Sequence, residues 1–223
     1  MAIALVAHAG AASANSSTAT TAGIDTTGAN LLVASIAFID FGGSNVVTDS
    51  NGNTWTALTE FGGSGASRAE KMFYCVNPTV GAGHTFTGSA PFPSVCVAAF
   101  SGADSTPFDQ ESGAVGSVQP GSITPAGDNE LFVTGIACTD AGTQTIDQGF
   151  SVTDSVGNGA NNIGCALAYL IQTTGAAQNP SWNPGSSGRT AMATFKASAG
   201  GGGGFVDNTS TILRCLLGGG LAC

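Results

Sequence analysis

Apolar residues on both faces of segment 30–39 predict a strand buried between two layers. The stretch reads Asn-Leu-Leu-Val-Ala-Ser-Ile-Ala-Phe-Ile and lacks the alternation of a strand with one solvated face. The same spacing returns a hundred residues later, where Leu31, Val33, Ile36 and Ala37 recur as Leu131, Val133, Ile136 and Ala137. We therefore expect two equivalent buried strands.

Other pieces of sequence repeat in the same order. VTDSNGN at 47–53 returns as VTDSVGN at 152–158, and VAAF at 97–100 returns as MATF at 192–195. The offset between the copies changes along the chain, as loop insertions and deletions would cause. The pattern predicts two copies of one structural unit, at about residues 20–103 and 117–198.

Short β-prone runs between Gly, Pro and Asn predict the remaining strands. They lie at 2–8, 17–22, 46–49, 54–58, 68–76, 84–88 and 94–101, and then at 130–139, 150–154, 165–172, 180–183 and 189–197. Residues 102–120, with Pro107, Gly113 and Pro120, are interpreted as a connector, and the second unit is expected to lack the counterpart of 54–58. Such spacing is typical of a sandwich. We predict an all-β fold over residues 1–198: a jelly-roll-like antiparallel β-sandwich built from two copies of a four- to five-stranded unit, with very little helix.

Asn51-Gly52 predicts a local hairpin. It separates the β-prone runs 46–49 and 54–58. A type I′ turn needs two residues that tolerate positive φ, and Asn-Gly meets that need.

Composition limits the partners. Charged residues make up 9% of the chain and the formal net charge is −9, which argues against a nucleic-acid partner because phosphates require a basic surface. No apolar run approaches the ~18 residues of a membrane-spanning segment, so we expect no membrane insertion. The apolar start of the chain is expected to be an edge strand at 2–8. A signal peptide is the alternative, although the basic n-region is missing.

The composition changes after residue 198. Residues 199–204 are a glycine linker, and residues 205–223 form an apolar segment that we expect to anchor the protein. Packing against its own domain and docking on a neighbouring chain both remain open. The candidate partner-binding residues are Phe205, Val206, Ile212, Leu213, Cys215, Leu216, Leu217, Leu221 and Cys223.

Catalytic patterns are missing from the sequence. There is no Gly-x-Ser-x-Gly elbow, His84 is expected to be a surface residue, and Glu70 beside Lys71 is expected on a solvated strand face. Asp49-x-Asn51-x-Asn53 superficially resembles a calcium loop, but its glycine is misplaced, so a turn is the better interpretation. We predict no catalytic residue, no metal site and no cofactor.

The cysteines and tryptophans are interpreted mainly as core residues. Cys75, Cys96 and Cys138 align with apolar residues of the other copy, which predicts buried free thiols, whereas the alignment says nothing about Cys165. For Cys215 and Cys223 an interchain disulfide is a further possibility. Trp55 and Trp182 are expected to pack in the core or at an end of the sandwich, with a carbohydrate contact as the alternative.

Several stretches resemble phage accessory virion β-sandwich proteins of the capsid-decoration, neck or tail-fibre type. They are VTDSNGNTW at 47–55, NPTVGAGHTFT at 77–87, VAAFSGA at 97–103 with PFDQ at 107–110, and the glycine-linked apolar C-terminus. The resemblance covers most of residues 20–198 and rests on turn and strand signatures. It implies a non-enzymatic structural role in a homo-oligomer attached to a larger shell or tube.

The leading functional hypothesis is therefore a virion structural protein. It would decorate or project from a phage capsid or tail, and its termini would contact neighbouring subunits and other virion proteins. A host glycan is a further candidate partner. The alternative is a carbohydrate-binding or adhesin module of a secreted bacterial surface protein, which predicts paired cysteines and an exposed aromatic platform at Trp55 or Trp182.

Overall fold

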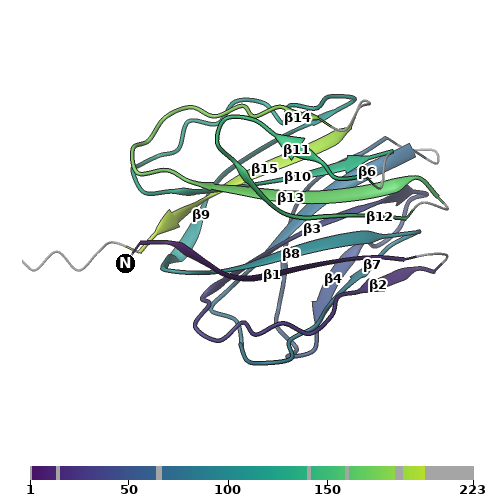
Figure 1. Cartoon of the computed structure of the whole chain (residues 1–223), viewed down its shortest axis with the longest axis horizontal. Helices are drawn as coiled ribbons and strands as arrows, with labels where there is room; N and C mark the ends of the chain where they lie inside the picture. Colours follow the sequence, from purple (N-terminus) through teal and green to yellow (C-terminus); the bar gives the residue numbers. More distant parts are fainter. Residues whose placement is uncertain are drawn as a thin grey trace, which may run out of the picture.

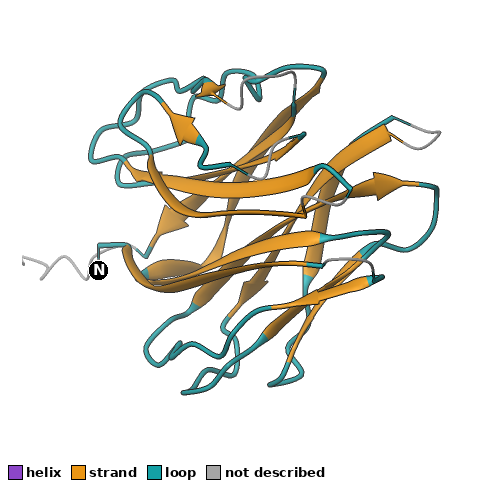
Figure 2. Cartoon of the chain, turned by 45° about the vertical axis from the view of Figure 1, so that its right-hand side comes forward, coloured by secondary structure: helices purple, strands orange, loops and turns teal. Residues whose placement is uncertain are grey.

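The computed structural model describes residues 2–13, 16–63, 67–139, 142–158, 161–183 and 188–198 (Figure 1). Every regular secondary-structure element within these residues is a β-strand (Figure 2). The first sheet has the order β1 (Ala4–Ala12), β8 (Ser94–Ser101), β3 (Leu31–Asp40), β6 (Ser67–Val76), β5 (Thr56–Phe61). The second sheet has the order β12 (Ser151–Asn158), β13 (Ile163–Ile171), β10 (Leu131–Cys138), β15 (Arg189–Ala197), β9 (Ala103–Val115). Every strand pair is antiparallel.

Two small sheets cover the outer faces of these large ones. The first cover is β2 (Thr18–Thr20), β7 (Phe86–Ser89) and β4 (Val46–Asp49), and the second cover is β11 (Thr145–Ile146) with β14 (Trp182–Asn183). In Figure 1 the covers lie below and above the two large sheets. The predicted all-β sandwich is thus confirmed, whereas its jelly-roll detail is not, because each half of the chain forms one whole sheet.

This layering explains why segment 30–39 is apolar on both faces. Leu31 and Val33 of β3 pack against the second sheet, whereas Ile36 and Phe38 pack against Phe86 of the first cover. The second sheet is buried in the same way, with Phe132 packed beneath Trp182 of the second cover. A fully buried Leu, Ile or Phe side chain stabilises a fold by about 1.5–3 kcal/mol. The covers therefore add two apolar layers to the central one.

The two large sheets share one order of strands along the chain. β1, β3, β5, β6 and β8 occupy the same relative positions in the first sheet as β9, β10, β12, β13 and β15 do in the second. β3 faces β10 across the interior, and β1 faces β12. This shared order supports the hypothesis of a duplicated unit, whose boundaries stay a prediction.

The interpretation of residues 102–120 as a connector was wrong. Residues Ala103–Val115 form β9, the longest described strand, which pairs with β15 at the edge of the second sheet. Its pairing with β15 shifts register twice. An edge position tolerates Pro107, because the missing N–H costs no bond to a second neighbour. Pro107 and Gly113 suggested a loop when only local propensity was considered.

The expected loss of a strand from the second unit was also wrong. β12 pairs with β13 at the edge of the second sheet, as β5 pairs with β6 at the edge of the first. The two VTDS stretches occupy different places: the first lies in β4 of the first cover, and the second lies in β12. A four-residue match between strands does not define which sheet each strand joins.

The Asn51-Gly52 segment is a turn, but the strands it connects do not form a hairpin. β4 pairs with β7, and β5 pairs with β6, so the chain passes here from the first cover to the first sheet. Gly52 has a φ of 73°, and its N–H donates to the Asp49 carbonyl at 3.3 Å. The hairpin prediction failed because long-range pairing took both strands to other partners.

The N-terminal segment is part of the sandwich. β1 pairs with β8 from Ala4 opposite Ser101 to Ala12 opposite Ser94, and it lies at the edge of the first sheet. The prediction of an edge strand at the start of the chain is thus confirmed. Within the described ranges, no helix has the length and apolarity needed to cross a membrane.

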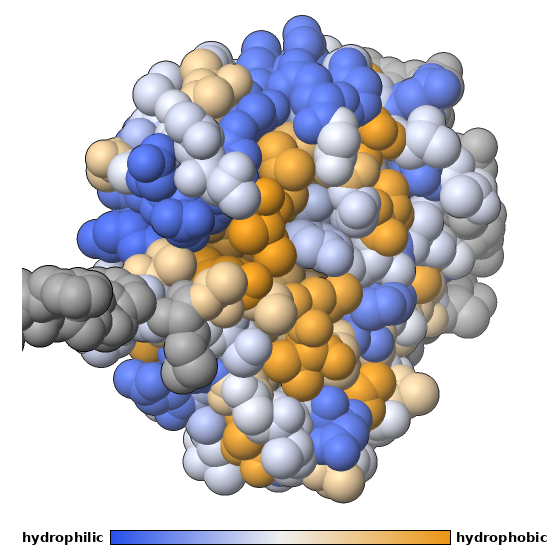
Figure 3. Space-filling model, turned by 60° about the vertical axis from the view of Figure 1, so that its left-hand side comes forward, coloured by the Kyte–Doolittle hydropathy of each residue, from blue (hydrophilic) through white to orange (hydrophobic). Residues whose placement is uncertain are grey.

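Both ends of the described chain meet at Gly102, the residue between the two halves. The Ser198 N–H donates to the Gly102 carbonyl at 2.8 Å. On the other side the Gly102 Cα lies so close to the Ala2 carbonyl that a Cβ at this position would collide with it, and Gly102 has a φ of 80°. Figure 3 shows this end of the molecule, where apolar atoms form a band between hydrophilic regions.

Candidate functional site

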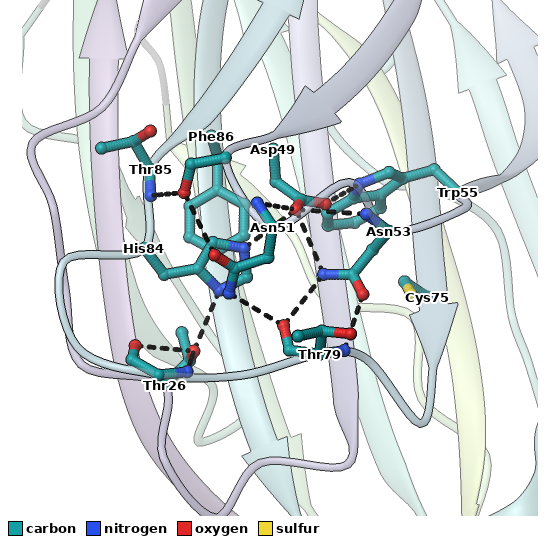
Figure 4. A network of polar contacts seen from close by, with 12 residues as sticks. Thr26, Asp49, Asn51, Asn53, Trp55, Cys75, Thr79, His84, Thr85 and Phe86 are labelled. Carbon is teal, nitrogen blue, oxygen red and sulfur yellow. Dashed lines mark hydrogen bonds and ion pairs between the residues drawn. The ribbon is translucent and has the colours of Figure 1, made fainter.

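The carboxylate of Asp49 lies at the centre of a network of polar contacts (Figure 4). Asp49 ends β4, so its side chain faces the turn that follows. Its Oδ1 accepts hydrogen bonds from the Asn51 N–H at 2.9 Å and from Asn53 Nδ2 at 3.1 Å, and its Oδ2 accepts one from Trp55 Nε1 at 2.7 Å. Asn53 and Asn51 also bond to Thr79, which ties the turn to the loop before β7.

His84 lies behind this carboxylate, in the interior. Its Nε2 is 3.1 Å from Asp49 Oδ1, off the axis of a hydrogen bond, so the contact is mainly electrostatic. Its Nδ1 is 2.9 Å from Thr26 Oγ1. Both the His84 and Asp49 side chains are 0% exposed, so the expectation of a surface histidine was wrong. The sequence failed here because the first cover and the loop at Thr26 close over the ring.

The hydrogen bonds keep Asp49 charged in spite of its covered position. Burial raises the pKa of Asp49, but the hydrogen bond from Trp55, the close His84 ring and the hydrogen bonds from the N–H groups of Asn53 and Asn51 together outweigh it, so the pKa lies below its ordinary value. A carboxylate held ionised in this way is a strong acceptor. Its role here is to fix the turn and the loops around it.

Thr26, His84 and Asp49 contact one another in this order in space. They have the residue types of a hydroxyl nucleophile, a base and a carboxylate. A nucleophile must reach a substrate, and Thr26 is 0% exposed. Its Oγ1 is also within 3.2 Å of both the Gly81 carbonyl and the Gly81 N–H. The arrangement therefore joins three loops inside the protein and presents no reactive atom at its surface.

The calcium-like spacing at residues 49–60 is a hydrogen-bonded turn. The Asp49 oxygens accept from N–H donors, and Glu60 points elsewhere, with Oε2 3.3 Å from Asn45 Nδ2 and 3.5 Å from Lys71 Nζ. Among the described residues no three His, Cys, Asp or Glu side chains gather as metal ligands would.

Glu70 is a second buried polar centre, and the expectation of a solvated position was wrong. It is 0% exposed between the large sheets, where Ser35 Oγ donates to its Oε1 at 2.5 Å. Cys165 Sγ lies 3.3 Å from the same hydroxyl. Burial raises the pKa of Glu70 well above its ordinary value, and the nearby Cys165 adds to this, whereas the Ser35 hydrogen bond opposes it. The site therefore favours the protonated form of Glu70 more than water does.

A glycine makes room for this carboxyl group. A Cβ at Gly135 of β10 would collide with Glu70 Oε1 and with Ser35 Oγ. Gly135 in the second copy of the repeat corresponds to Ser35 in the first copy, which lies one hundred residues earlier in the chain. A glycine within an otherwise apolar strand often marks a close approach, and this signal could have located the buried carboxyl from the sequence.

Glu130 has a pKa near neutrality. Burial and the neighbouring Asp109 raise the pKa of Glu130 to about 7. The Gly127 N–H, which donates to Glu130 Oε1 at 3.0 Å, has the opposite effect and lowers this pKa. A general acid works best with a pKa in this range. However, Glu130 is 1% exposed, so a substrate could not reach it without a movement of the loop at Gly127.

The described cysteines are buried free thiols. Cys75, Cys96 and Cys138 are as predicted, and Cys165 joins them. Burial, with help from Asp49, raises the pKa of Cys75 to about 11, and burial likewise raises the pKa of Cys96 well above its ordinary value. Because the thiolate is the reactive form, these groups are chemically quiet.

The tryptophans do not form an exposed platform. Trp182 belongs to the second cover and is 2% exposed, and its Nε1 donates to Thr134 Oγ1 at 3.3 Å. Trp55 is partly buried, bonded to Asp49 and edge-on to Phe86. The prediction of packing in the core or at an end of the sandwich is confirmed for both. The aromatic residue that is most exposed in the described chain is Phe41, at 59%.

The candidate partner-binding residues lie outside the described residues, as do Cys215 and Cys223. They are Phe205, Val206, Ile212, Leu213, Cys215, Leu216, Leu217, Leu221 and Cys223. The last described residue before them is Ser198, whose N–H donates to the Gly102 carbonyl. Comparisons with protein-family models, with curated proteins and with solved structures gave no match.

Proposed function

We propose that this chain is a non-enzymatic structural protein of a virion, which decorates or projects from a phage capsid or tail. It is attached through its two ends to neighbouring subunits. The observation that carries the proposal is the meeting of the two described ends at Gly102, because segments that leave from one place can contact the same neighbour. The opposite end of the strands is then free to project.

Apolar surface at this end supports the proposal. Leu5 at the start of β1 and Tyr169 and Ile171 at the end of β13 are partly exposed and pack against the central core. Toward the other edge of the sandwich, a hollow of about 260 Å³ between β5, β6 and β9 is lined by Tyr74, Phe108 and five further residues. A stable protein–protein contact buries about 1,600 Å² in total, and scattered apolar surface of this kind is suited to its centre.

The C-terminal segment would act as a tethered second contact. In the sequence, five glycines at 200–204 separate Ser198 from the apolar residues 205–223, and a run of this composition is typical of a linker. A tethered contact raises the effective concentration of the partner surface without a large interface of its own. Repeated by symmetry, weak contacts of this type give stable assemblies.

The buried positions of the reactive side chains also support a structural role. Thr26, His84 and Asp49 are enclosed, and the four described thiols are buried. The alternative, a secreted carbohydrate-binding module, predicts paired cysteines and a platform at Trp55 or Trp182. Neither is present in the described part of the chain.

Light scattering on the full chain and on a chain that ends at Ala199 tests the proposal. We expect the full chain to form a defined oligomer and the shortened chain to be a folded monomer with the same β-sheet circular dichroism. A full-length Leu216→Asp, Leu217→Asp variant should also lose the oligomer. If all three are monomers of equal stability, the C-terminal segment is not a self-assembly element and the proposal fails in this form.

A further inference from the structure

A cleft of about 780 Å³ opens at the end of the strands opposite to Gly102. Its walls are the turn after β3 (residues 41–45), the β7–β8 loop (residues 89–92) and the residues at the start of β2 (16–18). β8 begins at Ser94, next to this cleft, and ends at Ser101, next to Gly102. At about 3.3 Å per residue, the cleft lies roughly 25 Å from Gly102 and the two described ends. Figure 2 turns this end of the strands, opposite to the N-terminus, toward the reader.

The walls of the cleft are held in place by backbone hydrogen bonds. The Ala90 N–H donates to the Ser17 carbonyl at 3.0 Å, and the Ile39 N–H donates to the Pro91 carbonyl at 3.1 Å. These bonds join the β7–β8 loop to both of its neighbours. The volume lies in the range of small-molecule sites, which are usually formed before the ligand arrives.

The lining is uncharged and offers free hydroxyl groups. Its residues are Ser, Thr, Asn, Gly, Ala, Pro and Phe, with no ionisable side chain among them. The hydroxyls of Ser17, Ser44 and Ser89 make no hydrogen bond within the described ranges, so each can bind a ligand. Asn45, at the base, is 6% exposed and is held by Glu60.

Two phenylalanines in the cleft are held in unfavourable states. Phe41 leaves 59% of its surface in water. Phe92 has a φ of 54°, in the left-handed region that bulky residues avoid. Strained backbone of this kind costs about 1–3 kcal/mol and is concentrated at binding sites. Core packing does not explain the exposure of Phe41.

We propose that this cleft binds a neutral saccharide. A sugar ring has an apolar C–H face that can stack on Phe41, and its hydroxyls are neutral donors and acceptors that match Ser17, Ser44 and Ser89. A charged ligand would leave its charge unpaired here, which is costly. The inference goes beyond the proposed virion role. A saccharide site would exist whether or not the chain ends support assembly, so either proposal can fail without the other.

The test uses the full chain and defined sugars. Maltotriose, cellotriose, mannotriose, N,N′,N″-triacetylchitotriose and lactose are the neutral probes, and 3′-sialyllactose is the charged one. Saturation-transfer NMR identifies binding and titration calorimetry measures its strength. Three variants accompany the wild type: Phe41→Ala, Phe41→Trp and, as a matched control, Val115→Ala at another exposed apolar residue, 52% exposed on β9.

We expect at least one neutral sugar to bind with a millimolar or tighter dissociation constant, and sialylation not to improve binding. Phe41→Ala should weaken binding about tenfold, whereas Phe41→Trp retains it and Val115→Ala leaves it unchanged. Absence of binding by every neutral probe would overturn the proposal. This holds also if the cause is that residues 205–223 or a second copy of the chain occupy the cleft. Equal binding by Phe41→Ala and Val115→Ala would overturn it as well.

Discussion

His8 on β1 and Asp154 on β12 join the two large sheets at one edge, with His8 Nδ1 2.9 Å from Asp154 Oδ2. The two residues are 146 positions apart in the sequence. At the other edge, Thr59 on β5 donates to Glu111 on β9 through its N–H at 3.0 Å and its Oγ1 at 2.7 Å. Each edge of the sandwich thus has a polar contact between the two halves.

A double-mutant cycle with His8→Gln and Asp154→Asn should show weak coupling. Because the His8 side chain is 42% exposed, we expect a coupling of about 0.5 kcal/mol in the free energy of unfolding. Urea unfolding at pH 7 measures it. The cycle of His8→Gln with Glu111→Gln is the control and should be additive, since those residues lie at opposite edges. Additivity in both cycles would show that the first contact contributes nothing.

Glu70→Gln should remove a pH dependence above about pH 4.5. The pKa of Glu70 is raised in the folded state, so its contribution to stability is complete below the ordinary value of 4.5 and is lost as the pH rises. The loss is at most about 1.4 kcal/mol per pH unit. As the pH is raised from 5 to 9, urea unfolding should therefore show the free energy of unfolding of the variant increasing relative to that of the wild type. Glu111→Gln controls for loss of an exposed carboxyl. Parallel curves for Glu70→Gln and wild type would contradict a raised pKa of Glu70 in the folded state.

The loss of stability caused by Asp49→Asn should depend on pH, and it should become smaller as the pH falls into the acid range. The pKa of Asp49 is lowered in the folded state, so its contribution is present above 3.8 and is lost as the pH falls through the folded value. At pH 6 we expect the variant to be less stable by about 2–3 kcal/mol, because Trp55 and His84 lose a charged partner. The gap should shrink toward pH 2 in thermal unfolding. A gap that is constant over this range would mean that the carboxylate charge is not important.

Gly102→Ala should destabilise the protein more than Gly28→Ala. Both glycines have positive φ, 80° and 89°, but a Cβ at Gly102 meets the Ala2 carbonyl, whereas a Cβ at Gly28 meets nothing within 4 Å. Left-handed backbone costs about 1 kcal/mol for a residue with a Cβ, so we expect about 1 kcal/mol at Gly28 and about 3 kcal/mol at Gly102. Equal losses in urea unfolding would show that the ends do not press on Gly102.

The four described thiols should resist modification in the folded protein. Cys75 and Cys96 are buried, and burial raises the pKa of each. With Cys215 and Cys223 replaced by Ser, we expect Ellman's reagent at pH 8 to modify no thiol within minutes, and all four in urea. Rapid reaction of one thiol in the folded protein would reveal local opening at that strand.

Most strands could be located from the sequence because their apolar periodicity is local. The prediction for 94–101 coincides with β8, and that for 30–39 differs from β3 by one residue at each end. β9 was missed because its stability comes from pairing with β15, about eighty residues away, and not from its own composition. The two-residue strand β11 was missed for the same reason.

The polar centres were harder to predict because burial of a single side chain depends on distant elements. Glu70 is followed by Lys71 in the sequence, yet the two side chains face opposite ways, as alternate residues of a strand do. His84 is enclosed by Thr26 and Asp49, 58 and 35 positions away, and neither contact has a local signal. The cleft likewise combines three loops from separate parts of the chain.

Ala2 and Ser198, the two described ends, both lie at Gly102, the residue between the two halves. The described backbone therefore follows a nearly closed path. A circularly permuted chain could begin at β9, pass from β15 through a short link into β1, and finish at β8. It would retain every strand pair, since the new link and the new break both lie at Gly102. The strand pairs of each large sheet therefore do not require one half to come before the other in the chain.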